Sequence, residues 1–328
     1  MGYIPPFNLT DEMLQLASEI SELLGRIGSL NALDKLPRLR RAGRIKTIHS
    51  SLAIENNTLT IEQVTDIIDG KRVLGPPDEI LEVKNAHAAY KELENVDAFE
   101  MKDILRIHKI MMNGLVEENG RLRTVNAGVF TSDGQKIHSA PRPELLPGLM
   151  SDLFDWLKTT KTHPIISSSV FHYEFEYIHP FRDGNGRMGR YWQTAILMKW
   201  KPVFAWIPIE SIIRERQTEY YNAIRASSKN VSSNEFILYM LKAILDSVKA
   251  IVSDAQKHMN HINVRVRELL AVLEAYPQSA TQLMERLNLR SRDAFRNNYL
   301  RPAIEAGLVS LTEPDRPTSK NQMYLKRA

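Results

Sequence analysis

The spacing of apolar residues along the chain predicts a fold that is mostly helical. Ile104, Ile107, Met111 and Leu115 recur three or four positions apart, so they share one face of a helix that ends between residues 114 and 120. Further helices are predicted over residues 60–70, 78–94, 143–159, 164–177 and 234–248. Two of these helices are expected to start with a capping box, formed by Thr60 with Gln63 and by Ser232 with Glu235.

A β-hairpin is predicted where this helical pattern stops, over residues 128–141. Val129 and Phe130 come before Ser132-Asp133-Gly134, and Lys136-Ile137-His138 comes after it. An Asp-Gly pair between two short β-prone runs is a strong hairpin signal. The hairpin is therefore expected to turn at residues 132–134.

The last 66 residues predict a separate module. Helices are expected over residues 264–274, 280–286 and 291–306, followed by β runs at 308–312 and 322–325. Three helices and a hairpin are typical of a winged helix-turn-helix domain.

The basic charge of the chain lies in this module. The formal net charge is +4, and residues 263–328 carry 11 Lys and Arg against 7 Asp and Glu, which leaves the rest neutral. A basic module indicates contact with duplex DNA, although winged helices also serve as protein-docking modules. Four arginines would surround the reading helix, at positions 290, 292, 296 and 301.

Composition excludes several classes of protein. With 43% hydrophobic and 25% charged residues over 328 positions, the chain is expected to be globular, with two or three packed units. No cysteine is present, which excludes disulfides, thiolate metal sites and a cysteine nucleophile and fits a reducing, cytoplasmic location. No run of about 18 apolar residues indicates a membrane span.

The segment from Tyr177 to Arg190, Y-I-H-P-F-R-D-G-N-G-R-M-G-R, predicts an anion site. Gly184 and Gly186 allow backbone N–H groups to turn inward at the start of a helix, where the helix dipole favours negative charge. Arg187 and Arg190 lie one turn apart on that helix and share a face. Phosphate oxygens are the expected ligands.

Two phosphate-binding fingerprints do not account for this segment. Gly184, Gly186 and Gly189 match the dinucleotide pattern G-x-G-x-x-G, but the residues before them contain Pro180 and charged side chains where a buried strand is required. The Gly-Lys-Ser/Thr ending of a P-loop is absent.

The same segment resembles the signature of the Fic family, His-x-Phe-x-Asp/Glu-Gly-Asn-Gly-Arg-x-x-Arg. Every defined position is filled, by His179, Phe181, Asp183, Gly184, Asn185, Gly186, Arg187 and Arg190. The resemblance extends over about residues 50–230, since the family places a β-hairpin flap upstream and a Tyr-Tyr pair downstream, here Tyr220-Tyr221. It implies an N-terminal helical region over 1–99, a Fic catalytic core over 100–260, and the winged helix over 263–328.

The family's usual reaction is transfer of AMP from ATP to a protein hydroxyl, and the resemblance implies a role for each residue. His179 would accept the proton of the attacking Tyr, Ser or Thr hydroxyl, and Asp183 would hold Mg²⁺. Gly184, Asn185 and Gly186 would stabilise charge on the α-phosphate, and Arg187 and Arg190 would bind the outer phosphates. Phe181 would anchor the loop, and Tyr220, Tyr221 and Ile224 would wall the adenine.

An upstream segment resembles the family's inhibitory motif, Ser/Thr-x-x-x-Glu-Gly/Asn. Ser51 and Glu55 lie four residues apart, on one face near the C-terminal end of a helix, where a glutamate opposes the helix dipole. Pairing of Glu55 with Arg190 would remove that penalty and occupy the arginine expected to take the γ-phosphate. The resemblance therefore implies an autoinhibited enzyme.

The sequence leaves several alternatives open. Removal of AMP from a modified protein is possible at the same site, and a DNA-binding regulator with a nucleotide-sensing Fic core is the alternative from another functional class. The expected partners are ATP, a target protein or the chain itself as acceptor, and DNA or protein at residues 263–328. A homo-oligomer is also open, and no membrane partner is expected.

Overall fold

The structure is a computed structural model that describes residues 3–30, 37–130, 136–261, 264–314, 316, 319 and 321–326. The chain divides into two compact units, one made of residues Met1–Glu22 with Ala42–Val248 and the other of Leu23–Arg41 with Lys249–Ala328. Three helices contribute residues to both units, namely α1 (Asp11–Leu30), α2 (Pro37–Ile54) and α11 (Asn234–His261). The domain boundaries inferred from the sequence remain predictions.

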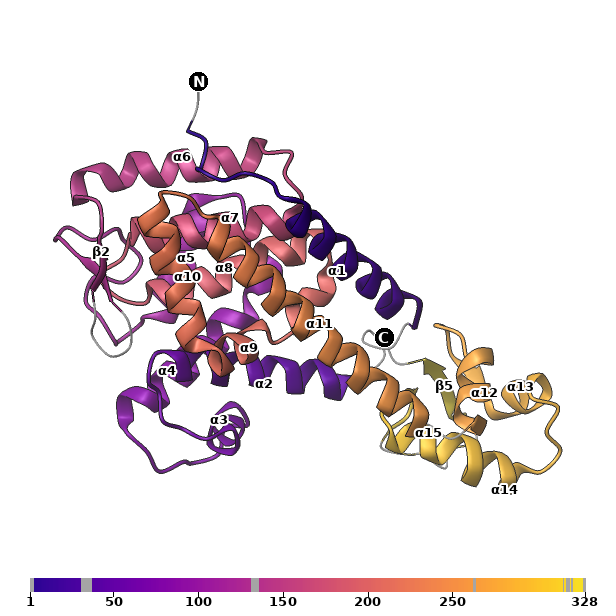
Figure 1. Ribbon diagram of the computed structural model, residues 1–328. Coiled ribbons are helices and arrows are strands. Elements are labelled where there is room, and N and C mark those ends of the chain that lie inside the picture. The colour runs from indigo at the N-terminus through magenta and orange to yellow at the C-terminus, as the bar shows by residue number, and fades with distance from the viewer. Residues whose placement is uncertain are drawn as a thin grey trace. The chain divides into compact units, whose positions relative to one another are not determined.

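The first unit is helical, as the apolar spacing predicts (Figure 1). Its other helices are α3 (Ile61–Ile68), α4 (Pro77–Lys91), α5 (Met101–Met111), α6 (Leu146–Thr159), α7 (Pro164–Ile178), α8 (Asn185–Trp200), α9 (Ile209–Glu215) and α10 (Gln217–Asn230). Short 3₁₀ turns lie at η1 (Leu93–Asn95), η2 (Pro143–Leu145) and η3 (Pro202–Trp206).

Two adjacent helices, α7 and α8, form the centre of this unit. Every residue of α7 is buried except Pro164 and Tyr177, which is expected of a helix covered on all sides. In Figure 1, α6 packs against α7 and α5 against α8. The segment predicted to bind anions is the connection between these two central helices, so packed helices fix both of its ends.

Two helix ends differ from the prediction. Helix α5 ends at Met111 rather than beyond residue 114, because the turn that follows carries Gly114 at φ +74°. The capping box at Thr60 and Gln63 forms as predicted. At the start of α11 the predicted box of Ser232 with Glu235 is wrong: the N–H of Phe236 donates to the hydroxyl of Ser227, on the preceding helix. A tertiary contact satisfies the helix donor there in place of a local one.

The predicted hairpin is present as an antiparallel pair, β1 (Gly128–Phe130) and β2 (Lys136–Ser139). Gly128 pairs with Ser139 and Val129 with His138, and the register shifts between Val129 and Phe130. The turn predicted at Ser132-Asp133-Gly134 lies outside the described residues.

The second unit has the winged helix-turn-helix arrangement. Its C-terminal part contains α12 (Val264–Val272), β3 (Gln278–Ser279), α13 (Ala280–Arg286), α14 (Arg292–Phe295), a π-helical turn η4 (Arg296–Leu300), α15 (Arg301–Glu305), β4 (Val309–Leu311) and β5 (Met323–Lys326). The strands form an antiparallel sheet in the order β3-β5-β4. Strand β3 is an addition to the prediction, which had two strands. It consists of two residues, and its second residue, Ser279, also forms the capping box with Gln282.

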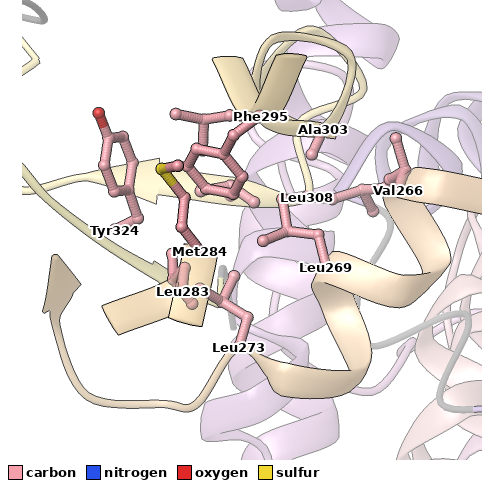
Figure 2. Close-up of a cluster of buried hydrophobic side chains, with 11 residues drawn as sticks. Val266, Leu269, Leu273, Leu283, Met284, Phe295, Ala303, Leu308 and Tyr324 are labelled. Atoms are coloured by element: carbon pink, nitrogen blue, oxygen red, sulfur yellow. The ribbon is translucent and has the colours of Figure 1, made fainter. Parts of the chain in front are cut away.

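A separate hydrophobic cluster holds the second unit together. Figure 2 shows Leu269 of α12, and Leu273 directly after that helix, facing Leu283 of α13 and Phe295 of α14, with Tyr324 of β5 at one side. These side chains are at most 8% exposed, so the unit has a core of its own. The predicted mostly helical fold with a β-hairpin and a C-terminal winged helix is thereby confirmed. No described helix has both the length and the apolarity that a membrane crossing requires.

We expect Phe295→Ala to destabilise the second unit by about 3–5 kcal/mol, because it removes a fully buried ring from this cluster. In the full chain, amide hydrogen exchange should accelerate across residues 264–326 and stay slow in α7 and α8. Arg292→Ala, an exposed change on the same helix, is the control. Unchanged protection in the second unit would show that Phe295 does not hold it together.

Candidate functional site

The connection between α7 and α8 is a loop that is closed by hydrogen bonds between one of its side chains and its own backbone. His179 ends α7 in the left-handed conformation, with φ 50° and ψ 60°. Phe181 is fully buried, and its N–H and carbonyl both bond to the side-chain amide of Asn185, at 2.9 and 2.8 Å. Asn185 therefore closes the loop with its side chain, and its predicted part in phosphate binding rests on its backbone N–H.

Three glycines let other groups come close to this loop and to the first turns of α8. A Cβ on Gly184, which has φ +80°, would lie 2.6 Å from the sulfur of Met112. A Cβ on Gly186 would lie 2.5 Å from a carboxylate oxygen of Glu55, and one on Gly189 would lie 2.8 Å from Glu176. The glycine at 186 is thus what admits a negative group to the N-terminal end of α8.

A buried histidine on α5 packs against the loop and bonds to its backbone. His108 stacks on Phe181 with ring centroids 3.7 Å apart. Its Nδ1 accepts the N–H of Gly120 at 2.8 Å, so the proton lies on Nε2, which donates to the carbonyl of Asp183 at 3.0 Å. Burial lowers the pKa of His108 to about 4. The imidazole is therefore neutral and fixed in one tautomer.

A buried arginine ties the loop to the base of the hairpin. Arg123 is 2% exposed, and its Nε donates to the carbonyl of His179 at 2.7 Å. Its other donors reach the carbonyls of Val125 and Pro141, on the two sides of the hairpin, at 2.7 and 2.6 Å. One guanidinium therefore sets the position of His179 relative to the hairpin.

The backbone of His179 is held in place, and one nitrogen of its ring has no hydrogen-bond partner among the described residues. The backbone N–H of His179 donates to the carbonyl of Phe175, and its backbone carbonyl accepts from Arg123. Nδ1 is buried, with no hydrogen-bond partner among the described residues. Burial, with His138 and Arg123 nearby, lowers the pKa of His179 below 6.5. A neutral imidazole at pH 7 has a lone pair with which to accept a proton.

Arg190 is buried against the C-terminal end of α2. Its side chain is 1% exposed, and its Nη2 donates to Glu55 Oε1 at 2.7 Å and to the carbonyl of Ser51 at 3.0 Å. Its Nε donates to the hydroxyl of Ser51 at 3.1 Å. Burial alone would lower the pKa of Arg190, but Glu55 raises it above its usual value. The predicted inhibitory residues and Arg190 thus lie together.

Helix α2 is fixed in this place by contacts along its length. Gly43 packs so closely against Trp206 that a Cβ would collide with that residue's carbonyl. Arg44 bonds to the carbonyl of Tyr90 and lies over the ring of Trp206, 4.9 Å from its centroid. At the C-terminal end Gln217 donates to the carbonyl of Ile54 at 2.9 Å, and Asn56 turns the chain with φ 70°.

Arg187, the second arginine of the segment, is also paired with acids. Its Nη1 donates to Glu82 of α4 at 2.8 Å, and its Nη2 lies 3.3 Å from Asp183. The other oxygen of Glu82 accepts from Asn57 at 2.8 Å. Asn57 lies two residues after Glu55. The segment 55–57 therefore contacts Arg190 directly, through Glu55, and Arg187 indirectly, through Glu82.

The residues predicted to wall the adenine are mostly in the core. Tyr220 and Ile224 are each 2% exposed, and the hydroxyl of Tyr220 lies 3.2 Å from His172 Nε2. Tyr221 is partly exposed. Burial raises the pKa of Tyr221, and the nearby charge of Glu55 raises it further. The adenine wall remains a prediction, for which Tyr221 is the most accessible candidate.

The residues that support the loop differ in how far they could be predicted from the sequence. His108 lies one position after Ile107 in the apolar stripe of α5, and an imidazole in such a stripe is a signal of a buried polar contact. Arg123 lies in a connection without periodicity, and Glu82 is an ordinary helix glutamate. Nothing local distinguishes these two residues, because their partners are distant in the chain.

Asp183 has the chemistry to hold a hard cation. Its side chain is 56% exposed, beside the N-terminal end of α8. No group of three or more potential metal ligands gathers within the described ranges. One accessible carboxylate fits Mg²⁺, which usually takes one or two carboxylates and completes its shell with phosphates and water.

We expect the stability of the protein to report on His108 as the pH falls. Its pKa of about 4 in the fold lies below the 6.5 of an unfolded histidine, so the unfolded state binds the extra proton first. Between pH 6.5 and 4 the parent should lose unfolding free energy relative to His108→Gln, by an amount of the order of 3 kcal/mol. Urea unfolding at several pH values measures this difference. Parallel curves for the two proteins would contradict a buried neutral imidazole.

Comparisons with known proteins agree with this geometry. The sequence profile of the Fic/DOC family matches residues 98–197, and a profile described as "Filamentation induced by cAMP protein Fic-like, C-terminal domain" matches residues 264–325. The crystal structure of a Fic family protein from Desulfovibrio desulfuricans G20 is 46% identical, with a TM-score of 0.76, and each chain covers 99% of the other.

Curated relatives named "Protein adenylyltransferase Fic" are more distant. The one from Nematostella vectensis is 33% identical over 205 residues, which are 58% of this chain and 45% of the relative. The one from Culex quinquefasciatus is 29% identical over 220 residues, which are 62% of this chain and 41% of the relative. The chain spans less than half the length of these two relatives. By the extent of its match to the Desulfovibrio structure, the chain belongs to the Fic family.

Proposed function

We propose that this protein transfers AMP from ATP to a Tyr, Ser or Thr hydroxyl of a target protein, and that Glu55 inhibits the transfer. The observation that carries the proposal is the contact of Arg190 with Glu55 and Ser51, next to the glycine-lined N-terminal end of α8 and the loop that holds His179. The names of the distant adenylyltransferase relatives support the same reaction.

The residues fit the bonds that change in this reaction. The target hydroxyl oxygen forms a bond to the α-phosphorus, the bond from that phosphorus to the bridging oxygen breaks, and pyrophosphate leaves. The free ring nitrogen of His179 accepts the hydroxyl proton. The N–H groups at the start of α8 face negative charge on the α-phosphate, and Arg187 and Arg190 bind the outer phosphates.

Asp183 would hold Mg²⁺, which neutralises phosphate charge when it is bound with ATP. The Asp183 carboxylate lies 3.3 Å from Arg187 Nη2. If the Asp183 carboxylate bound a cation, Nη2 of Arg187 would become available to a phosphate oxygen, while Glu82 would still hold Nη1 of Arg187.

Inhibition follows from the position of the Glu55 carboxylate. It lies over Gly186, at the positive end of α8, and takes the donor of Arg190 that a γ-phosphate would need. ATP that binds beside this carboxylate must place its triphosphate differently, away from the line of hydroxyl attack. An error of about 1 Å in that line can cost about 10²-fold in rate.

We expect Glu55→Gly to raise AMP transfer by about 10²-fold at saturating Mg²⁺ and ATP, because it clears the phosphate position and frees Arg190. Incorporation of label from α-³²P-ATP into lysate proteins and into the protein itself measures the gain. Changing Arg190 to Ala in the same chain should remove it, and His179→Ala should abolish transfer in either background.

Glu55→Gln is the matched control, since it keeps the volume of the side chain at the same place and should gain much less. Equal rates for the parent and Glu55→Gly would mean that Glu55 does not inhibit. Faster loss of AMP from a pre-labelled protein in the parent than in Glu55→Gly would favour removal of AMP as the reaction of this site.

A second function is favoured by the exposed arginines of the winged helix. Arg290, Arg292 and Arg296 are exposed around the third helix of the module, as a duplex-reading helix requires. We propose that this unit binds duplex DNA. The other possibility for the same surface is a protein partner.

We expect the full chain to retard duplex DNA at low salt, with affinity that falls steeply as salt rises. Arg292→Ala combined with Arg296→Ala should weaken binding by about tenfold or more and reduce the salt slope by about 2. Lys242→Ala, an exposed basic change in the first unit, is the control. No retardation of any duplex at low salt would leave the protein-docking role.

A further inference from the structure

A cavity of about 350 Å³ lies in the first unit, beside the N-terminal segment. It is lined by Tyr3, Ile4, Pro6, Tyr173, Glu174, Tyr177, Ser228 and Val231. Its volume is at the lower end of the range of ligand sites, which suits a single side chain. None of its lining residues belongs to the His179–Arg190 segment.

The walls of the cavity are fixed rather than loosely folded over it. The carbonyl of Pro6 accepts from the N–H of Ser233 at 2.9 Å, and Asn8 and Asn234 exchange two bonds, at 2.9 and 3.1 Å. Phe7 packs edge-on against Trp156. These contacts hold the N-terminal segment against α11 and α6, so the cavity is preformed.

A buried carboxylate faces this space without a cation. Glu174 is 4% exposed, and its Oε2 accepts from the hydroxyl of Tyr3 at 2.6 Å. Within the described part of the chain Glu174 takes part in no ion pair, and burial raises its pKa to about 7. A carboxylate that is buried beside a cavity gains most from a positive group placed there.

The aromatic rings point to the same kind of ligand. Tyr3, Tyr173 and Tyr177 all line the cavity, and the faces of tyrosine rings attract cations, most strongly away from water. The tyrosine rings that line the cavity can accept the apolar stem of a long side chain, and Glu174 can accept its charged end. Neither a free phosphate nor another carboxylate would be favoured here.

The position of the cavity relates it to the reaction site. The ring of Tyr177 stacks on His138 of β2, with centroids 4.6 Å apart, and the Tyr177 carbonyl is 2.9 Å from His138 Nε2. His179 follows two residues later, so the Cα atoms of Tyr177 and His179 are at most about 7.6 Å apart. Tyr177 thus links the wall of the cavity to the hairpin, two residues before His179 in the chain.

We propose that this cavity binds the side chain of an arginine or lysine that the target protein carries close to its acceptor hydroxyl. The proposal rests on the proposed AMP transfer for its biological use, but the binding of a cationic side chain is testable without that reaction. It assigns a sequence preference to the target: a basic residue within a few positions of the modified one.

The first test is binding of Nα-acetyl-arginine methylamide to the full chain, followed by saturation-transfer NMR, with the neutral citrulline analogue as the matched ligand. The arginine compound should bind about tenfold more tightly, and Glu174→Gln should remove the difference. Glu117→Gln, an exposed carboxylate elsewhere in the unit, should leave it intact. Equal affinity for the two compounds would overturn the proposal. So would the absence of binding by either compound up to about 20 mM, a concentration roughly one decade above a millimolar Kd.

The second test uses the Glu55→Gly protein and acceptor peptides that contain one tyrosine with arginine or citrulline at nearby positions. At one spacing the arginine peptide should have a KM about tenfold lower, and Glu174→Gln should equalise the pair. Transfer to both peptides with equal KM at every spacing would refute the cavity and leave the transferase intact. Preferential binding of the arginine compound without transfer to any peptide would instead refute the reaction.

Discussion

The buried guanidinium of Arg190 is the constraint on which the site depends. A cation with a side chain only 1% exposed must have acceptors, because an unpaired charge in the interior is strongly unfavourable. The protein supplies them from the C-terminal end of α2, where the Ser51 carbonyl accepts from Arg190 and Glu55 adds a charge. That requirement explains why Gly43 and Gln217 hold α2 so firmly against its neighbours. A phosphate group can meet the same requirement, so one set of donors has two alternative occupants.

The loop before α8 shows how a reactive imidazole is positioned while its ring stays available. The backbone of His179 is fixed by its bonds to Phe175 and Arg123, and Nδ1 of its ring has no hydrogen-bond partner in the described part of the chain. His108 and Asn185 then fix the carbonyl of Asp183 and the backbone of Phe181, so the loop cannot rearrange independently. Rigidity of the backbone with a free side chain is what a proton acceptor requires.

The sequence was informative wherever the signal was local. Apolar periodicity located the helices, the pairing of Thr60 with Gln63 located a helix cap, and the Asp-Gly pair located the hairpin. The glycine-rich segment indicated the positive end of a helix. Contacts between distant segments were not readable in this way: the Ser227 hydroxyl replaced the local cap at α11, and Arg123 joined the hairpin to His179 across 56 residues. The pairing of Glu55 with Arg190 was expected from a family resemblance, since spacing alone gives only a misplaced glutamate. The buried position of Tyr220 shows the limit of such a resemblance, because a motif residue can serve the core.

The two partners of the Glu55–Arg190 pair differ in what they would lose by separation. The side chain of Glu55 is 31% exposed and can be solvated when it leaves, whereas Arg190 remains buried and would keep only the oxygens of Ser51. The free-energy cost of opening the pair is therefore mainly the loss of an acceptor for the buried guanidinium, and another anion at the same place offsets it. A buried cation beside the N-terminal end of α8 selects a highly charged anion, because both the guanidinium and the helix dipole favour negative charge. In the proposed reaction, release of the Glu55 carboxylate and binding of the terminal phosphate are thus opposite sides of one exchange. Any partner that pulls the C-terminal end of α2 away from Arg190 would shift that exchange toward the nucleotide by the free energy with which it favours the displaced helix.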